Sequence, residues 1–300
     1  MSHPDSETAQ PAEFAASLLQ TARRAAAAGA AVLAGRDAGV LSRVDGAAET
    51  KSSGSDWVTE FDLAAEKAVR AVLAAERPND TVTGEEQGTS RVTEPSGFRW
   101  SIDPLDGTTN FIRDIVYYAT SVAVADAEGV WLAGVVNAPA LGREYWAVRG
   151  GGAWRLDVPR SLGGEGGSEP WPRRLNGPAA GRAEAGSALL ATGFSYDPGV
   201  RAEQAASLPG LMEGFGDMRR LGSAALDLCL VADGTHDAYG ERGLNEHDFA
   251  AGALIAEEAG CWVRRPILTS PLLGGPSDQE RLAGWTCAGG LEFSGRFPVE

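Results

Sequence analysis

Cysteine and histidine are scarce in this chain, which contains only three of each among 300 residues. The cysteines, at positions 229, 261 and 287, are far apart and odd in number, and no Cys-x-x-Cys or Cys/His spacing occurs. A zinc site or a disulfide framework needs such a pattern, so neither is predicted. Scattered free cysteines are typical of a reducing compartment, and we therefore expect a cytoplasmic location.

Positive charge is also deficient, since 26 Lys and Arg residues face 41 Asp and Glu residues and leave a formal net charge of −15. Nucleic-acid affinity comes mostly from basic side chains, so a nucleic-acid partner is not predicted. No apolar run reaches the roughly 18–20 residues that span a bilayer. The segment Met1–Pro11 lacks the basic start and apolar run of a signal peptide. These absences exclude a membrane protein from our expectations.

The length of 300 residues and the hydrophobic content of 43% fit one large globular domain or two medium ones. We expect a disordered tail over residues 1–12, an N-terminal α+β half over 13–176 and a C-terminal α/β half over 177–300. The stretch 150–186 is rich in Gly, Pro and Ser and is interpreted as an irregular connection.

Helices and strands alternate along both halves, which predicts a layered α/β (α+β) protein. The expected helices cover residues 15–34, 62–76, 199–213, 224–232 and 247–259. The expected strands cover residues 81–83, 98–102, 120–125, 130–137, 143–148, 187–192, 217–221 and 285–288, and another begins at 237.

The most informative segment is Asp103-Pro-Leu-Asp-Gly-Thr-Thr-Asn-Phe111, which follows an apolar run typical of a buried strand. Two carboxylates at a strand end, next to the backbone N–H groups of a Gly-Thr-Thr turn, can hold divalent cations beside a phosphate. That combination indicates phosphoryl chemistry. Asp-Pro and Asp-Gly are also common in plain turns, so this segment alone leaves both interpretations open.

Four further acids lie at the ends of predicted elements: Asp62, Glu85, Glu86 and Asp248. Asp62 and Asp248 each fall in the first turn of a helix, where a carboxylate complements the helix dipole by about 0.3–1 kcal/mol. A Glu-Glu pair after glycine is often a solvated turn. Each acid taken alone therefore has a structural explanation as well as a functional one.

These acids belong to a series of motifs that occur in a fixed order and indicate one shared function. They are Lys51-Ser-Ser-Gly-Ser-Asp-Trp-Val-Thr-Glu-Phe-Asp62, Gly84-Glu-Glu86, Asp103–Phe111, Arg220–Cys229, Asp237–Glu241 and Asp248–Gly260. Over about residues 15–262 the chain resembles the inositol monophosphatase family of magnesium-dependent, lithium-sensitive phosphatases. The resemblance implies alternating helix and sheet layers, a sandwich related to fructose-1,6-bisphosphatase, and a homodimer.

The resemblance also implies a site for two to three Mg²⁺ ions. Glu85, Asp103 and the carbonyl of Leu105 would hold one ion, and Asp103, Asp106 and Asp248 would hold a second. A third and weaker ion would bind near Glu85. Mg²⁺ prefers oxygen ligands in near-octahedral geometry, which is consistent with the lack of a His/Cys cluster.

The same resemblance assigns the catalytic and substrate-binding residues. Thr108, with Asp62 behind it, would orient the attacking water beside Glu85, and Lys51 matches a loop lysine near the third metal. The residues implied to bind the substrate are Asp106, Gly107, Thr108, Gly222, Ser223, Ala224, Glu241 and His247. The substrate would be a small phosphate ester.

The main departure from the family pattern is His247, which stands where the family usually has Trp, directly before the metal ligand Asp248. It could face the ligand, or it could be a packed or solvent-facing residue. Glu241 matches a residue that contacts a ring hydroxyl and favours myo-inositol 1-phosphate or a related polyol or sugar phosphate. The change at His247 leaves open a specialised enzyme acting on a nucleoside or nucleotide phosphate or on histidinol phosphate. His3 and His236 are predicted to lie on the surface.

A hypothesis of a different class is a non-catalytic regulatory binding protein, because some family members are linked to RNA polymerase or RNA. The complete set of metal carboxylates and the negative net charge favour the enzyme over this alternative.

Overall fold

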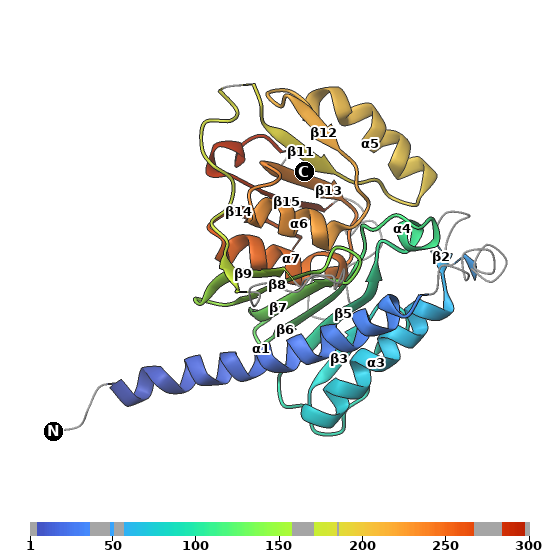
Figure 1. The fold of residues 1–300 in the computed structure, drawn as a ribbon, viewed down its shortest axis with the longest axis vertical. Helices are drawn as coiled ribbons and strands as arrows, with labels where there is room; N and C mark the ends of the chain where they lie inside the picture. The colour runs from blue at the N-terminus through green and yellow to red at the C-terminus, as the bar shows by residue number, and fades with distance from the viewer. Residues whose placement is uncertain are drawn as a thin grey trace, which may run out of the picture.

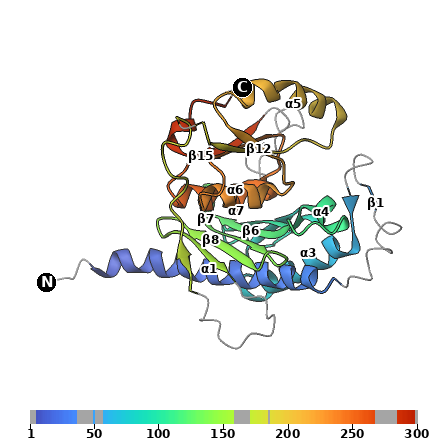
Figure 2. The same ribbon diagram turned by 45° about the horizontal axis from the view of Figure 1, so that its top comes forward.

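Alternating layers of helix and sheet build the molecule (Figures 1 and 2). The computed structural model describes residues 5–36, 49–50, 57–157, 171–184, 186–266 and 284–297. From bottom to top in Figure 1, two helices cover a first sheet, two more helices separate it from a second sheet, and one helix covers the second sheet outside. The layered α/β prediction is confirmed.

The first layer consists of α1 (Asp5–Ala34) and α3 (Glu60–Glu76), which pack on each other and on the first sheet. In α3 the apolar residues Ala65, Val69 and Leu73 recur every four residues and are fully buried. In α1, Leu18 and Ala22 are likewise four residues apart and buried. Both helices share a hydrophobic core cluster with the sheet. The periodicity of the sequence thus explains why these helices lie flat on the sheet.

Helix α1 begins at Asp5, and its first turns extend past the edge of the sheet (Figures 1 and 2). The predicted tail over residues 1–12 overlaps the start of this helix and stays a prediction. Ala, Glu and Gln are good helix formers, so the helix continues through this polar segment in spite of Pro11. Among the described residues, no helix has the length and apolar character needed to cross a membrane.

The first sheet has eight strands in the order β10-β9-β8-β7-β6-β5-β3-β4, all antiparallel except for the parallel pair β3 and β5. The strands are β3 (Thr81–Gly84), β4 (Gly88–Thr89), β5 (Arg99–Asp106), β6 (Ala119–Ala125), β7 (Trp131–Ala138), β8 (Arg143–Val148), β9 (Gly152–Asp157) and β10 (Arg173–Arg174). Helices cover both faces, which explains why β6 is buried along its whole length. A separate pair, β1 (Glu49–Thr50) and β2 (Trp57–Val58), is antiparallel.

Helices α6 (Ala224–Ala232) and α7 (Glu246–Glu258) form the central layer and are the most buried helices described. Small residues let them approach closely. A Cβ added at Gly252 of α7 would lie 2.8 Å from the Leu228 Cβ of α6, and one at Gly134 of β7 would lie 2.9 Å from the Ala251 Cα. This close packing fixes the N-termini of both helices against the first sheet.

The second sheet has the order β12-β11-β13-β15-β14. Its strands are β11 (Leu189–Thr192), β12 (Asp217–Arg219), β13 (Ala238–Arg242), β14 (Trp262–Arg264) and β15 (Trp285–Gly289). Helix α5 (Pro198–Leu211) covers its outer face through Leu211, which shares a cluster with Leu190 and Phe293. The 3-10 turn η2 (Leu291–Phe293) follows the last strand, and no longer closing helix is described. The predicted helices from residue 62 to 259 and the strand at 285 are confirmed within two residues, whereas the helix predicted from residue 15 already begins at Asp5.

Two predictions need correction. The stretch 150–186 is not wholly irregular, because it contains β9 and β10, whose start is obscured in the sequence by Gly150, Gly151 and Gly152. His236 is only 2% exposed, since the turn after α6 folds it back toward Asp227 of that helix. The predicted boundary between halves at 176/177 falls in the segment between β10 and β11.

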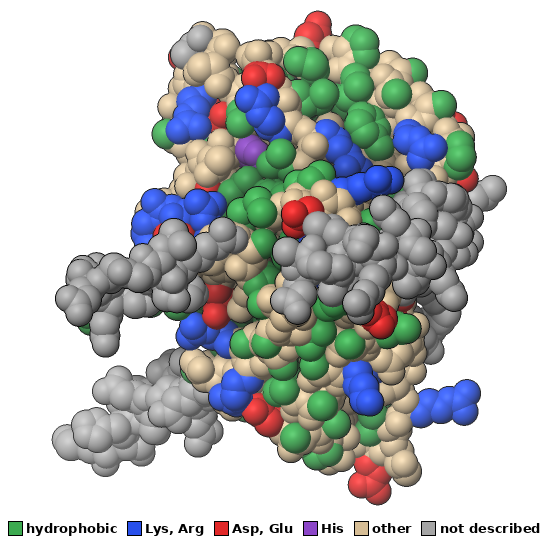
Figure 3. Space-filling view, turned by 45° about the vertical axis from the view of Figure 1, so that its right-hand side comes forward, with side chains coloured by type: hydrophobic (Ala, Val, Ile, Leu, Met, Phe, Trp, Pro, Cys, Tyr) green, Lys and Arg blue, Asp and Glu red, His purple; other side chains and the backbone are tan. Residues whose placement is uncertain are grey.

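The surface is mixed in character. On the face shown in Figure 3, Lys and Arg side chains are interspersed with acidic and apolar ones, and the described side chains of this face form no continuous basic stripe.

Candidate active site

A β-bulge in β5 brings the two carboxylates of the Asp103 motif to one side. Asp103 pairs with Ser121 of β6 and Asp106 with Ala119, so β5 contains one residue more than its partner in this stretch. Residues three apart in a regular strand face opposite sides, and the extra residue reverses this. The Thr120 hydroxyl donates to the Pro104 carbonyl at 2.9 Å and holds the bulge in place. Asp103 and Asp106 therefore both face the same cavity.

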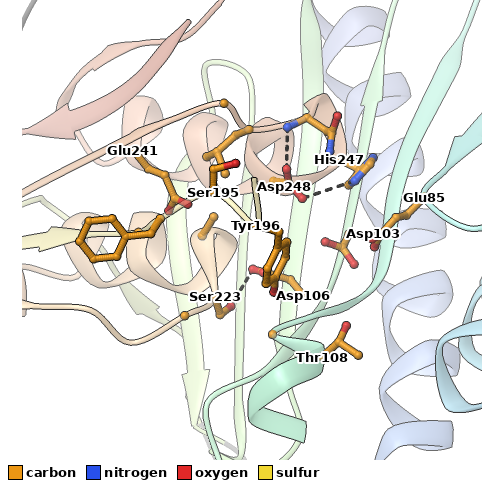
Figure 4. Close-up of a pocket in the computed structure, with 18 of the residues that line it drawn as sticks. Glu85, Asp103, Asp106, Thr108, Ser195, Tyr196, Ser223, Glu241, His247 and Asp248 are labelled. Atoms are coloured by element: carbon orange, nitrogen blue, oxygen red, sulfur yellow. Dashed lines mark hydrogen bonds and ion pairs between the residues drawn. The ribbon is translucent and has the colours of Figure 1, made fainter. Parts of the chain in front are cut away.

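This cavity, of about 620 Å³, lies between the first sheet, the N-termini of α6 and α7, and the ends of β11 and β13 (Figure 4). Twelve residues predicted for the site line it: Glu85, Asp103, Leu105, Asp106, Gly107, Thr108, Gly222, Ser223, Ala224, Glu241, His247 and Asp248. They come from both halves of the chain, so the fold brings together residues that are far apart in the sequence. Lys51 lies outside the described residues.

Asp62 is fully buried and lies behind Thr108 rather than on the cavity wall. Its Oδ2 accepts from the Thr59 backbone N–H at 2.7 Å and from the Thr59 hydroxyl, so Thr59 and Asp62 form the capping box of α3. Its Oδ1 lies 3.1 Å from the Thr108 hydroxyl, which is also 3.0 Å from the Leu105 carbonyl. The capping role of Asp62 thus leaves its second oxygen for Thr108, because each oxygen makes a different contact.

Asp106 ties the first sheet to the start of α6. Its Oδ2 accepts from the Ser223 hydroxyl at 2.6 Å and from the Ala225 N–H at 2.7 Å. Ser223 is also the N-cap of α6. Asn110 adds a second link, since its side-chain amide donates to the Tyr117 carbonyl at 2.7 Å and to the Leu221 carbonyl at 2.8 Å. The loop that precedes α6 is therefore fixed beside the motif Asp103–Phe111.

Asp248 is the third residue of α7 and completes a capping box with Asn245, whose N–H donates to the Asp248 Oδ2 at 2.6 Å. Arg99 of β5 pairs with Glu246 at the start of the same helix. These contacts hold the first turn of α7 over Asp103. The second oxygen of Asp248 lies 3.4 Å from the His247 Nε2 and faces the cavity (Figure 4).

The loop that carries Glu85 is held by Glu66, a buried residue that was not predicted for the site. The Glu66 carboxylate accepts from the N–H groups of Glu86 at 2.7 Å and Gln87 at 3.1 Å, and Arg70 donates to it at 2.7 Å. A Cβ added at Gly84 would lie 2.4 Å from the Glu66 Oε1, so glycine is required there. Glu66 and Arg70 are four apart on α3 and look like an ordinary surface ion pair in the sequence.

Replacing Glu66 with Gln should lower the free energy of unfolding by about 3–5 kcal/mol, because it leaves the buried side of the Arg70 pair uncompensated. The loop that carries Glu85 should also become more mobile. Urea unfolding measures the first effect, and hydrogen exchange of the 84–88 amides measures the second. Lys67→Gln, at an exposed position of the same helix, is the control and should change stability by less than about 0.5 kcal/mol. Equal stability of the two variants would show that Glu66 does not anchor this loop.

Glu241 marks the opposite end of the cavity from Asp103 (Figure 4). The Tyr239 hydroxyl donates to its Oε2 at 2.8 Å, and a Cβ at Gly193 would lie 1.9 Å from the same oxygen. The segment 193–197, which follows β11, lines this end together with Arg220 and Arg242. Arg220 belongs to the motif Arg220–Cys229 but was not predicted to line the site, and the segment 193–197 and Arg242 carry no motif that would have indicated them. The segment 193–197 follows the carboxyl end of the parallel strand β11, and ligand sites commonly lie at such ends. This position was the signal that could have indicated the segment.

The electrostatics of the cavity favour the binding of positive charge. Burial, helped by the charge of the nearby Asp248 and opposed by the hydrogen bond from Ser223, raises the pKa of Asp106 to about 8. Burial, followed by the charges of Glu85, Asp106 and Asp248, raises the pKa of Asp103 well above its usual range. These carboxylates repel one another, and burial disfavours their charged forms.

The residues present therefore fit a divalent cation. Ligand atoms of Glu85, Asp103 and His247 lie within 4.8 Å of one another, which is a spacing that one ion can bridge. Asp106 and Asp248 face the same space. A cation would offset the repulsion that raises the carboxylate pKa values, and oxygen-rich donors are what Mg²⁺ prefers.

Comparisons with known proteins agree with this geometry. The inositol monophosphatase family matches residues 15–274. Inositol-1-monophosphatase SuhB of Mycobacterium tuberculosis is 41% identical over 283 residues, which cover 92% of this chain and 89% of the relative. Nus factor SuhB of Pseudomonas aeruginosa is 37% identical over 243 residues, which cover 77% and 82%.

A solved structure has the same fold. The extragenic suppressor protein suhB from Bartonella henselae superposes with a TM-score of 0.74 at 29% identity and covers 93% of this chain and 95% of its own. The family match, the two relatives and the shared fold lead to one conclusion: the chain belongs to the inositol monophosphatase family.

Proposed function

We propose that this protein hydrolyses a small phosphate monoester with the help of two to three divalent cations such as Mg²⁺. Glu85, Asp103, the Leu105 carbonyl, Asp106 and Asp248 would hold the cations. The observation that carries the proposal is the bulge in β5, which turns Asp103 and Asp106 into one cavity with Glu85 and Asp248. Bound cations would offset the charge of the ester and lower the pKa of a water nucleophile.

The chain's own residues would orient that water. The Thr108 hydroxyl has one proton, which it donates to Asp62 or to the Leu105 carbonyl. Its oxygen is then left to accept a hydrogen bond from water in the cavity. Burial raises the pKa of Asp62 to about 6, and the hydrogen bonds from Thr59 oppose this. We therefore assign Thr108 as the residue that positions the water and Asp62 as the residue that positions Thr108.

Gly107 would let the phosphate approach the backbone. Its φ of 98° lies in the left-handed region, and an added Cβ would lie 2.9 Å from the Tyr117 carbonyl oxygen. Both Gly107 and Thr108 line the cavity, and we assign their N–H groups as the donors to phosphate oxygens. Gly222, Ser223 and Ala224 line the same cavity and would contact the alcohol part of the ester.

The substrate that we propose is a polyol phosphate, with myo-inositol 1-phosphate as the first candidate. Glu241 supports it, because a buried carboxylate at the end away from Asp103 can accept hydrogen bonds from ring hydroxyls. The identity of the M. tuberculosis relative, named an inositol-1-monophosphatase, supports it as well. The alternative substrate is a nucleoside phosphate or histidinol phosphate. The segment 193–197 and His247 support it, because they do not form a purely apolar cavity wall.

Glu241→Gln should reduce kcat/KM for myo-inositol 1-phosphate by roughly 10–100-fold, which is the effect of one hydrogen bond to a charged group. It should change the hydrolysis of p-nitrophenyl phosphate little, because that ester has no ring hydroxyl. Phosphate release measured with Mg²⁺ on both esters gives the result, and Glu128→Gln, at an exposed position that does not line the cavity, is the control. Wild-type preference for a nucleoside phosphate or histidinol phosphate would contradict the polyol assignment.

The relative named Nus factor SuhB supports a second candidate, a regulatory binding role. The measurement that separates the two is phosphate release from a broad set of esters. If the wild-type protein releases none with any divalent cation, the binding role becomes the better proposal.

A further inference from the structure

His247 is held in a fixed position above the metal motif. It lies in the first turn of α7, between Glu246, which pairs with Arg99, and Asp248, which completes the capping box. The Ser121 hydroxyl lies 3.5 Å from the His247 carbonyl, and Ser121 is the strand partner of Asp103. The backbone around His247 is thus held to β5 through Glu246 and to β6 through Ser121.

The imidazole faces the carboxylates rather than the solvent or the apolar core. A ring nitrogen of His247 lies with oxygens of Glu85 and Asp103 in a group whose ligand atoms are all within 4.8 Å of one another (Figure 4). The side chain is 14% exposed and lines the cavity. Its Nε2 is buried and has no hydrogen-bond partner among the described residues, although the Asp248 Oδ1 lies 3.4 Å away.

A buried imidazole nitrogen without a partner is costly unless something else satisfies it. An ion shared with Glu85 and Asp103 would satisfy the nitrogen and offset both carboxylates at once. Imidazole is a ligand that suits Co²⁺, Ni²⁺ and Zn²⁺, whereas Mg²⁺ prefers oxygen and binds nitrogen poorly.

We propose that His247 is a metal ligand, and that with Glu85 and Asp103 it makes this position selective for a nitrogen-binding transition-metal ion over Mg²⁺. The inference rests on the metal site of the proposed function and specifies which ion that site binds best. A Trp at this position has no lone pair to offer, so the selectivity would belong to chains that carry His here.

The test is direct metal binding to the chelator-treated protein, with Co²⁺ and Mg²⁺ as separate probes in calorimetric titrations. Wild-type protein should bind Co²⁺ more tightly than Mg²⁺. His247→Gln should weaken Co²⁺ binding at least about 10-fold, since even outer-shell partners of a metal ligand are worth 10–100-fold. It should leave Mg²⁺ affinity little changed. The visible d–d spectrum of bound Co²⁺ should also change, because a nitrogen ligand is lost.

The variant should fold, because the His247 Nε2 makes no hydrogen bond within the described protein and Gln is a good helix former. Its melting temperature in chelator, compared with that of wild type, verifies this. His236→Gln changes a histidine that does not line the cavity and is the matched control for Co²⁺ affinity. Unchanged Co²⁺ affinity and spectrum in His247→Gln, or tighter wild-type binding of Mg²⁺ than of Co²⁺, would overturn the inference and leave the proposed phosphatase intact. Failure of the wild-type protein to bind either ion would overturn the metal site itself.

Discussion

At saturating Mg²⁺, Asp103→Asn should release phosphate at least about 10³-fold more slowly than the wild-type protein. Charge stabilisation by a bound metal is worth several kcal/mol, and each 1.36 kcal/mol is about tenfold in rate. Asp103 is proposed to hold both principal cations, so its loss weakens two ions at once. Asn keeps the shape and the acceptor for the Leu105 N–H, which donates to the Asp103 Oδ1 at 3.0 Å.

The same variant should be at least as stable as the wild-type protein when metal is removed. The charges of Glu85, Asp106 and Asp248 act on Asp103 in a buried position, and a neutral amide relieves that repulsion. Phosphate release and urea unfolding in chelator measure the two effects. Asp114→Asn, at a side chain 69% exposed, is the control for both. Activity near that of wild type would remove Asp103 from the metal site, and a large loss of stability would assign it a structural role.

The sequence predicts the acids of this site well, because the motif places each at the end of an element. It does not predict why Asp103 and Asp106 point the same way. That depends on the bulge at Pro104 and Leu105, where the partner strand β6 determines the register. Strand pairing is a long-range property, so the residue spacing alone leaves the direction of each side chain open.

Other residues were missed because their surroundings decide their role. Glu66 has the sequence context of an exposed helix position, and only the packing of the 84–88 loop on α3 buries it. His236 follows a helix-ending turn and was expected at the surface, but it is buried and lies near Asp227 of α6. His247 was left open between packing and ligand contact, and the first turn of α7 directs it to the carboxylates. In each case a distant segment supplies the contact.

Without metal, the protein should lose stability as the pH rises from 6.5 to 8. Burial, as the largest cause, raises the pKa of Asp106 to about 8 and that of Glu241 to about 7. In the unfolded chain both groups are already ionised above about pH 5. The folded state therefore binds more protons across this interval, and the free energy of unfolding must fall as the pH rises.

His236 has an effect of the opposite sign, because burial lowers its pKa to about 4. That effect lies mostly below pH 6.5 and adds no more than about 0.4 kcal/mol above it, because the unfolded imidazole has a pKa of about 6.5. The raised pKa of Asp103 adds to the fall in stability. Over 1.5 pH units a single group such as Asp106 can contribute up to about 2 kcal/mol. Urea unfolding in chelator at pH 6.5, 7.2 and 8.0 measures this slope.

Asp106→Asn should flatten the slope, because Asn retains an acceptor for Ser223 and Ala225 but has no proton to lose. A saturating divalent cation should flatten it in the wild-type protein as well, since a bound ion favours the ionised carboxylates and offsets their repulsion. A slope that stays the same in Asp106→Asn would assign the pH dependence to other groups. A wild-type slope that is flat or rising in chelator would show that the cluster is hydrated well enough to ionise without a cation, and the electrostatic argument for a metal in this cavity would then fail.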